Sequence, residues 1–334
     1  MREEKWVISA KRADFQKIAQ DYGIDPVIAR LIRNRDVQSK EALDQYLNGK
    51  VEDLPSPWAF KDMERAVEIL ESKIRLGKAI RIIGDYDIDG VISTYILLRG
   101  LSRLGALVDT YIPDRIADGY GIHLPLVQRA LEDQIDTILT CDNGIAASQE
   151  IQYAKDNEMT VIVTDHHEVP FQDVEGERVE ILPPADAILN PKQRGCGYPN
   201  KNLCGAAVAY KLILALYQRH EIPQKEREEF VELVAVATVG DVMDLQGENR
   251  VLVKEGLRRL EHTWNLGLRE LIRANGLEGK KISAYHIGFV VGPCLNASGR
   301  LDTAARSLDL LKSQDSGKAA KLAGDLVNIN QSRK

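Results

Sequence analysis

The stretch AIRIIGDYDIDGVISTYILLRGLSRLG, residues 79–105, decides the fold class. Its first six residues are rich in isoleucine, which indicates a buried strand. Residues 91–105 then carry apolar side chains three and four positions apart and end on a glycine, as is typical of an amphipathic helix. A strand followed directly by a helix is the first half of a βαβ unit, in which helical crossovers join parallel strands.

The same alternation continues toward the C-terminus. Alternating strands and helices indicate a parallel β-sheet flanked by helices on both faces, so we predict the α/β class. Helical patterns replace the alternation from about residue 204 onward, which predicts a helical C-terminal half. The expected strands lie at 79–84, 107–113, 136–141, 160–165 and 186–191, and the expected helices at 91–105, 124–134, 146–158, 205–220, 225–240 and 250–262.

The composition excludes several classes of protein. With 334 residues, 44% hydrophobic and 28% charged, the chain is an ordinary globular sequence. It has no apolar run of transmembrane length and no apolar segment of a secretory signal. Its four cysteines form no C-x-x-C pair, which disfavours a zinc site and favours a reducing cytoplasm. The net charge of −6 does not favour nucleic-acid binding, but carboxylates that hold cations also count as negative.

Acidic side chains follow several predicted elements directly. Three aspartates stand in GDYDIDG after the first strand, one stands in TCDNG, one precedes two histidines in VTDHH, and Asp241 is the first of the two aspartates in VGDVMDL, after a helix. Because the carboxyl ends of parallel strands share one edge of a sheet, we expect the groups that follow strands to meet there. The groups that follow strands are Asp85, Asp87, Asp89, Asp142, Asp165, His166 and His167, and Asp241 is the group that follows a helix.

Two simpler interpretations compete with a metal site. A single aspartate after a strand is usually a helix N-cap. The run Asp-x-Asp-x-Asp-Gly can also begin a calcium loop, but such a loop needs a glutamate about six residues after the glycine. This chain has Ile96 at that position. Alternate carboxylates on one side of a chain repel each other unless a cation lies between them, so the run favours bound cations over capping alone.

The ligand types indicate which cations these are. Carboxylate oxygens with an imidazole nitrogen suit Mn²⁺ or Mg²⁺, with Mn²⁺ the better match, and the thiolates of a structural zinc site are lacking. There are enough carboxylates for two ions. Two ions about 4 Å apart are a standard arrangement for cleaving phosphate esters, because one lowers the pKa of a water and the other stabilises the phosphate charge.

The order of these motifs resembles the DHH phosphoesterase family. GDYDIDG, PDRIADGYG, TCDNGIA, VTDHHEVP, VATVGDVMDL and GPCLNASGRL are similar to the family's bacterial single-stranded-DNA exonucleases, over nearly the whole chain. The resemblance implies an N-terminal helical region over 1–75, a phosphoesterase domain over 76–305, and a helix over 306–334 that leads to further domains. We therefore expect the chain to be the front part of a longer protein, whose other domains help to close the DNA groove.

The resemblance also implies roles for individual residues. The expected metal ligands are Asp85, Asp87, Asp89, Asp142, His166 and Asp241. The expected catalytic residues are His167, which would face the scissile phosphate, Asp165, which would orient its neighbours, and Asp85, beside the first ion. The expected substrate-binding residues are Arg115, Asn296, Ser298 and Arg300.

Three details qualify these roles. Asp142 is expected to bridge the two ions. Ser298 and Arg300 are expected in a Gly-flanked loop, and arginine suits a phosphate contact because its planar fork makes bidentate bonds. An exposed ion pair is the alternative for Arg300. Some relatives have a further histidine ligand where this chain has Ile83, so the first metal site is expected to depend more on Asp85.

Three functions follow as hypotheses. The first is a single-stranded-DNA-specific 5′-to-3′ exonuclease of DNA repair and recombination, located in the cytoplasm, with a helicase and a single-strand-binding protein as partners. The second is another DHH phosphoesterase, acting on short oligonucleotides or cyclic dinucleotides, against which the N-terminal helical region counts. The third is a non-catalytic binding module, against which the complete set of acidic motifs counts.

Overall fold

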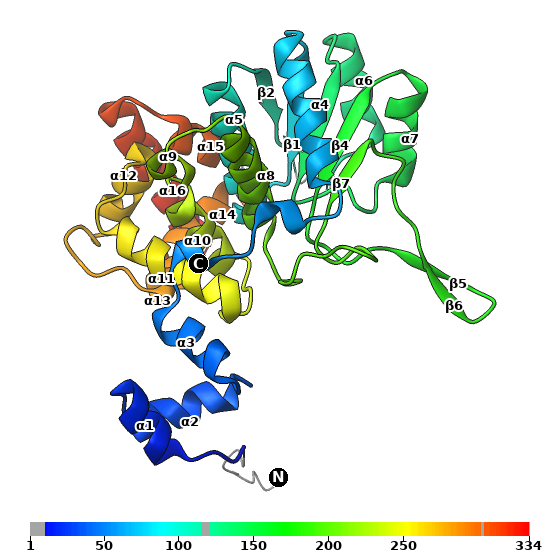
Figure 1. The fold of residues 1–334 in the computed structure, drawn as a ribbon. Helices are drawn as coiled ribbons and strands as arrows, with labels where there is room; N and C mark the ends of the chain where they lie inside the picture. Colours follow the sequence, from blue (N-terminus) through cyan, green and yellow to red (C-terminus); the bar gives the residue numbers. More distant parts are fainter. Residues whose placement is uncertain (1–10, 115–120, 302–303, 334) are drawn as a thin grey trace, which may run out of the picture.

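A five-stranded parallel sheet forms the centre of the molecule (Figure 1). The computed structural model describes residues 11–114, 121–301 and 304–333. The strands follow the order β2-β1-β3-β4-β7, which confirms the predicted α/β class and all five predicted strands. Their bounds are β1 (Ala79–Gly84), β2 (Leu107–Tyr111), β3 (Thr137–Cys141), β4 (Thr160–Thr164) and β7 (Ala187–Leu189).

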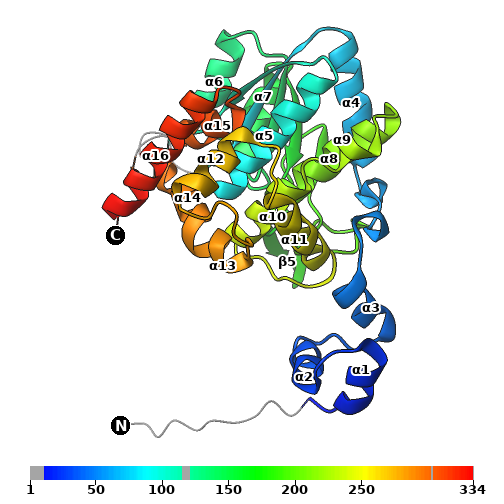
Figure 2. The same ribbon diagram turned by 90° about the vertical axis from the view of Figure 1, so that its left-hand side faces the viewer.

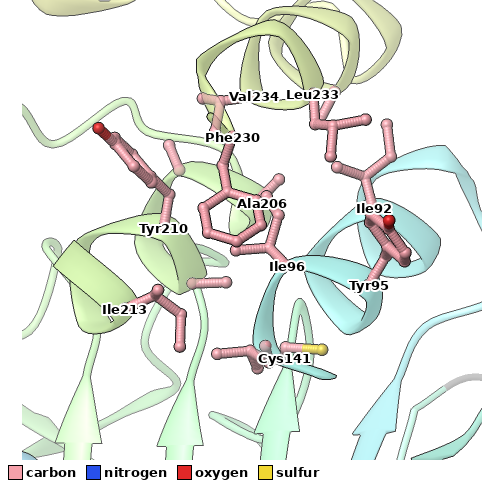
Figure 3. Packing of buried hydrophobic residues seen from close by; sticks show 14 of the residues in the cluster. Ile92, Tyr95, Ile96, Cys141, Ala206, Tyr210, Ile213, Phe230, Leu233 and Val234 are labelled. Atoms are coloured by element: carbon pink, nitrogen blue, oxygen red, sulfur yellow. The ribbon is translucent and has the colours of Figure 1, made fainter. Parts of the chain in front are cut away.

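Helices cover both faces of this sheet. Alternate residues of β1 point to opposite sides, so Ile82 belongs to one hydrophobic core and Ile83 to the other. The core around Ile82 includes α4 (Met63–Arg75), α5 (Ile88–Arg103) and α8 (Gly205–Arg219). The core around Ile83 includes α6 (Leu124–Glu132) and α7 (Ser148–Asp156). Figure 3 shows the first core, where Ile96 and Ala206 meet Phe230 above Cys141.

The C-terminal half is a further layer of helices packed on α5 and α8. Its members are α9 (Gln224–Arg227), α10 (Val231–Gly240), α11 (Gly247–Leu260), α12 (Leu266–Ala274), α15 (Ala305–Lys312) and α16 (Ser316–Arg333). The predicted helix over 225–240 is broken into α9 and α10. At the break, the Glu228 carbonyl accepts from the Val231 N–H at 3.1 Å and from the Arg259 guanidinium at 2.9 Å.

A long helix near the C-terminus contains a π-helical turn. It runs through α13 (Ala284–His286), η3 (Ile287–Val291) and α14 (Gly292–Leu301) without a break. Pro293 explains the wide turn, because proline has no N–H to donate to the Phe289 carbonyl one turn earlier. Gly292 instead donates to the Ile287 carbonyl, five residues back. The expected loop around Ser298 is therefore wrong, since that residue lies inside α14.

The N-terminal helices as far as α3 (Lys40–Asn48) stand apart from the main body (Figure 2), whereas α4, which also falls within the expected region 1–75, packs on the sheet. This N-terminal part comprises α1 (Phe15–Tyr22), α2 (Pro26–Asn34) and α3, followed by the 3₁₀ turns η1 (Val51–Asp53) and η2 (Pro57–Ala59). Ile32, Leu43 and Tyr46 form its own small core. Arg250 of α11 joins it to the body by donating to the Tyr46 carbonyl at 2.7 Å.

A fully buried ion pair fastens the linker after this region. The Lys211 ammonium lies 2.6 Å from a Glu248 carboxylate oxygen and donates to the Pro55 carbonyl at 3.0 Å. The Tyr198 hydroxyl donates to the same carboxylate at 2.8 Å. Burial lowers the pKa of Lys211, while the Glu248 charge opposes that change. Each charge here has an opposite charge or a hydrogen bond beside it.

Two further features differ from expectation. A hairpin of β5 (Phe171–Val174) and β6 (Glu177–Glu180) follows the DHH residues, where no strand is predicted. The single helix expected over 306–334 is divided into α15 and α16, and Ala319, Ala323 and Leu326 of α16 are buried in the main core. All four cysteines are described, are buried and form no disulfide. Among the described helices, none combines the length and apolar character that crossing a membrane requires.

Candidate metal centre

The register of the sheet brings three aspartates to one edge. Gly84 at the end of β1 pairs with Cys141 of β3, and Cys141 pairs with Thr164 of β4. The next residue of each strand is an aspartate, so Asp85, Asp142 and Asp165 stand at adjacent strand ends. All three are buried, with 2%, 2% and 1% of their surface exposed. The predicted convergence at the carboxyl edge is confirmed.

The first turn of α5 supplies two more carboxylates. Asp87 is the N-cap of α5 and accepts from the backbone N–H groups of Asp89, at 2.8 Å, and Gly90, at 3.1 Å. The capping interpretation is therefore correct for Asp87, whose carboxylate also belongs to a potential metal-binding group. The calcium-loop alternative is wrong, because Gly90 and the buried Ile96 both lie inside α5.

Asp89 is held by the start of another helix. Its two carboxylate oxygens accept from the backbone N–H groups of Gly205, at 2.6 Å, and Ala206, at 2.8 Å. The N-terminus of α8 therefore provides two donors and a positive dipole end. A Cβ on Gly205 would lie 2.7 Å from the Cβ of Asp142, so only glycine fits between these aspartates. Sequence reasoning missed this supporting role of Gly205.

His166 lies among three of the carboxylates. Its Nε2 atom is 3.0 Å from an oxygen of Asp142, 3.6 Å from one of Asp89 and 3.7 Å from one of Asp241. Asp241 reaches the site from the C-cap of α10. Three potential metal-binding groups result: Asp85, Asp87 and Asp142; Asp89, His166 and Asp241; and Asp142, His166 and His167. Within each, the ligand atoms lie within 4.8 Å of one another, and Asp142 belongs to two groups.

The electrostatics of the cluster call for positive charge. Burial and then Asp87 raise the pKa of Asp85 to about 7, and burial and then Asp89 raise that of Asp241 to about 7. The pKa of Asp142 is raised further by burial and by the neighbouring carboxylates. Among the described residues, Oδ1 of Asp85 and Nδ1 of His166 are buried without a hydrogen-bond partner. Unpartnered buried oxygen and repelling carboxylates fit a divalent-cation site.

Asp165 has a different environment from the other aspartates. It accepts from the backbone N–H groups of Ile145, His166 and His167, and it bonds His167 Nδ1 at 2.8 Å. Burial raises its pKa, but these hydrogen bonds outweigh burial and lower it. The bond from Asp165 in turn raises the pKa of His167, whose side chain is 45% exposed. Asp165 therefore orients the two histidines, and His167 faces outward.

Comparison with known proteins places this geometry in a family. Residues 79–238 match the model of the DHH family, N-terminal domain. The chain belongs to the DHH family.

Two relatives that are similar over most of this chain are both named single-stranded-DNA-specific exonuclease RecJ. The chain is 38% identical to the single-stranded-DNA-specific exonuclease RecJ of Bacillus subtilis over 330 residues, 98% of this chain and 40% of that protein. It is 35% identical to RecJ of Escherichia coli over 323 residues, 93% of this chain and 54% of that protein. The chain thus spans about half or less of the length of these curated relatives.

A solved structure also matches. RecJ of Thermus thermophilus in complex with Mn²⁺ is 34% identical, with a TM-score of 0.78 over 96% of this chain and 44% of that one. The sheet and the helical layers described above are therefore the DHH architecture found in RecJ.

Among the described residues, two of the seven non-glycine residues with positive φ lie at the candidate metal centre. Asp142 has φ 59° and Val242, next to Asp241, has φ 58°. The left-handed region is unfavourable for any residue with a Cβ and most of all for a β-branched one such as valine. Such strain persists where the surroundings hold it and is found most often at functional sites. Val242 is also 87% exposed, so packing of its own side chain does not explain the conformation.

The structure changes the view of the expected substrate residues. The side-chain oxygen of Asn296 accepts from the Ile88 N–H at 2.7 Å, so it supports the acidic loop. Ser298 is fully buried and bonds Ser307 and the Leu295 carbonyl, which contradicts a direct substrate contact. Arg115 lies outside the described residues. Arg300 is the residue before the last one of α14, and its side chain lies outside the described part of the structure.

Proposed function

We propose that the chain is the catalytic part of a single-stranded-DNA-specific 5′-to-3′ exonuclease that hydrolyses terminal phosphodiesters during DNA repair and recombination. The observation that carries the proposal is the set of three overlapping ligand groups among the described residues, in which Asp142 and His166 each belong to two. Two adjacent cation sites with a common carboxylate suit phosphodiester cleavage. The naming of the RecJ relatives as single-stranded-DNA-specific exonucleases supports the substrate class.

The proposed cofactor is a pair of Mn²⁺ ions, with Mg²⁺ as the alternative. Asp85, Asp87 and Asp142 would hold one ion, and Asp89, His166 and Asp241 would hold the other. An oxygen of Asp142 lies 3.0 Å from Nε2 of His166, so Asp142 would also contribute to the second site. The buried unpartnered oxygen of Asp85 and the raised pKa values support this assignment. When bound, the ions supply a more acidic water and neutralise charge on the phosphate.

The proposed role of His167 follows from its bond to Asp165. Asp165 occupies Nδ1, so the imidazole presents Nε2 on its exposed side. A raised pKa favours the protonated ring, which donates a hydrogen bond to a phosphate oxygen or to the leaving oxygen. Asp165 stays ionised and fixes the orientation of the ring.

Arg115 and Arg300 remain proposed phosphate contacts, now without Ser298. Replacement of either by alanine should leave Mn²⁺ affinity unchanged and weaken binding of a 5′-phosphorylated strand. In a plot of the logarithm of the binding constant against the logarithm of the salt concentration, each lost phosphate contact should make the slope shallower by about 0.7. Unchanged salt slopes in both variants would remove these arginines from the proposal.

The cellular setting is part of the same proposal. Four buried thiols without a disulfide are compatible with the reducing cytoplasm, where we place the activity. A helicase and a single-strand-binding protein are the proposed partners, because an enzyme for single strands needs a duplex to be opened and kept open.

The test is digestion of end-labelled DNA with and without Mn²⁺. Single-stranded DNA should be shortened from its 5′ end, a blunt duplex should resist, and chelation should stop the reaction. Short RNA and cyclic dinucleotides run in parallel separate this function from that of other DHH phosphoesterases. Preferred cleavage of those small substrates, with long single strands left intact, would overturn the proposal.

A further inference from the structure

Two large aromatic side chains lie exposed on the helix that contains the π turn. Tyr285 is 64% exposed and Phe289 is 67% exposed. Their ring centroids lie 5.0 Å apart with an angle of 27° between the planes, so the rings stack on one another. The pair presents a continuous aromatic surface to the outside. Exposed apolar surface that is concentrated in one place usually marks a binding site.

The opposite side of this helix packs against elements of the candidate metal centre. Gly288 faces Val239 near the end of α10, two residues before Asp241, with 3.8 Å between its Cβ position and the valine. Farther along, Asn296 accepts from the N–H of Ile88 in the acidic loop. Figures 1 and 2 both show α13 beside α11, in the layer to which α10 belongs. The aromatic pair is therefore attached rigidly to the elements that carry the metal ligands.

The charged residues next to the pair in the sequence are basic, which favours binding of a polyanion. Lys280 and Lys281 are exposed and lie just before α13, and no acidic residue occurs between Glu278 and Asp302. This contrasts with the net charge of −6 for the whole chain. The β5–β6 hairpin offers a contrast, because the Arg178 guanidinium already lies over the ring of its exposed Phe171, 4.3 Å from the centroid, and the hairpin also carries Asp173, Glu175, Glu177 and Glu180.

The backbone under the pair is also unusual. Phe289 lies within the π turn, where the helix is wider than an α-helix. Single π turns inside α-helices occur frequently at functional sites. The turn therefore adds an observation that is independent of exposure and charge.

We propose that Tyr285 and Phe289 form a stacking platform for the bases of the single strand on the 3′ side of the cut, and that Lys280 and Lys281 contact its phosphates. Aromatic rings stack on any base, and basic groups beside them attract the backbone, which is how proteins bind single strands without regard to sequence. The inference rests on the proposed function and adds a site that grips the strand outside the metal centre.

The test compares substrates that reach the platform with one that does not. The substrates are a fifteen-nucleotide strand, the same strand with abasic residues after its third nucleotide, and a dinucleotide. Tyr285→Ala/Phe289→Ala should raise KM for the normal strand by about tenfold or more, the usual scale for lost base stacking. The kcat and KM for the dinucleotide should stay at wild-type values, which also shows that the variant is folded.

Two further comparisons make the result specific. The abasic strand should show the raised KM already with the wild-type protein, and the double variant should add little to it, because the same contact is missing in both. Tyr285→Phe/Phe289→Tyr should behave as wild type. Phe171→Ala is the matched control, since it removes an exposed aromatic ring whose face Arg178 already covers, and it should change the KM of neither the strand nor the dinucleotide.

The outcomes distinguish the platform from the function. If the wild-type chain cleaves neither the strand nor the dinucleotide, the proposed function fails. If the wild-type chain cleaves both and the double variant keeps the wild-type KM for the strand, the platform is overturned. An unchanged KM together with a changed molar mass in light scattering would assign the aromatic pair to contact between two copies of the chain.

Discussion

Two buried polar clusters in this molecule have opposite electrostatic designs. Around Lys211, a buried ammonium faces the Glu248 carboxylate, and a tyrosine hydroxyl and a carbonyl complete the hydrogen bonding. At the sheet edge, burial and the charges of neighbouring carboxylates, chiefly Asp87 and Asp89, raise the pKa values of Asp85, Asp142 and Asp241. The first cluster is complete by itself, whereas the second gains stability from added positive charge.

This difference teaches how to separate structure from function among buried charges. A balanced cluster is costly to disturb and offers nothing to a ligand, because its donors and acceptors are already used. An unbalanced cluster persists only where something outside the chain repays its cost. Neighbouring carboxylates with raised pKa values are therefore a stronger sign of a cation site than burial alone.

The largest expected effect comes from removing the shared carboxylate. Asp142→Asn should reduce phosphodiesterase activity by about 10³-fold or more and abolish tight Mn²⁺ binding, because both ion sites lose a ligand. Without metal, its melting temperature at pH 8 should equal or exceed that of the wild type, since a repelling charge is gone. Calorimetric Mn²⁺ titration and thermal unfolding measure both effects.

The control for that variant is Asp156→Asn on the exposed end of α7, which should retain Mn²⁺ binding and activity. Tight Mn²⁺ binding by Asp142→Asn would contradict the assignment of the shared ligand.

The balanced cluster should respond in the opposite way. Lys211→Met leaves the Glu248 carboxylate buried without its cation, which should lower the free energy of unfolding by about 3–5 kcal/mol. Adding Glu248→Gln should restore much of the loss, because no unpaired charge remains. Urea unfolding measures the stability, and Mn²⁺ titration should show unchanged affinity in both variants. A loss of Mn²⁺ affinity would mean that the two clusters are not independent.

The two histidines sharpen the division inside the metal centre. His166→Ala should weaken Mn²⁺ binding, because its Nε2 atom lies among three carboxylates. His167→Ala should leave Mn²⁺ affinity nearly unchanged and slow cleavage by about 10²-fold, the scale for one charge-stabilising group. Equal losses of Mn²⁺ affinity in the two variants would refute this division of roles.

The smallest effect tests a buried carboxylate outside both clusters. Burial raises the pKa of Glu232 to about 7 from its ordinary 4.5, although Thr263 and the Asn265 N–H oppose the shift. Between these values the folded chain holds a proton that the unfolded chain has released, so stability falls as pH rises from 4.5 to 7. The melting temperature should therefore fall between pH 4.5 and pH 7, and this fall should be about 2 °C smaller in Glu232→Gln than in the wild type.

The comparison with the wild type cancels the titration of Asp85 and Asp241, which is common to both proteins. In contrast to the metal centre, adding Mn²⁺ should not change the difference between the wild type and Glu232→Gln. A difference that Mn²⁺ removes would mean that Glu232 also interacts with the ions.

The strands and the ligand cluster can be predicted because local patterns specify them. Buried strands read as short apolar runs, and a parallel register then places whatever follows each strand at one edge. Asp85, Asp142 and Asp165 are predictable in this way. Asp241 follows a helix, so its position depends on the family resemblance and not on the sheet.

Other parts depend on contacts that no local pattern reveals. Gly205 lies far from Asp89 in sequence, and only the packing of α8 against α5 turns its N–H toward that carboxylate. The hairpin of β5 and β6 has polar side chains on both faces, so its sequence lacks the alternation of apolar and polar residues that identifies a strand. The sequence predicts a loop at Ser298 because glycine flanks that segment and disfavours helices, yet the segment is helical and follows a π turn.

The spread of the ligands along the chain has a consequence for folding kinetics. From Asp85 to Asp241, the proposed ligands belong to or follow five elements, β1, α5, β3, β4 and α10, which meet only after β1, β3 and β4 have paired in register. Parallel pairing requires long loops to close, so it is a slow step. Cations therefore have no complete site to bind until folding is nearly finished. They act on the finished fold, where they slow unfolding and leave the rate of folding almost unchanged.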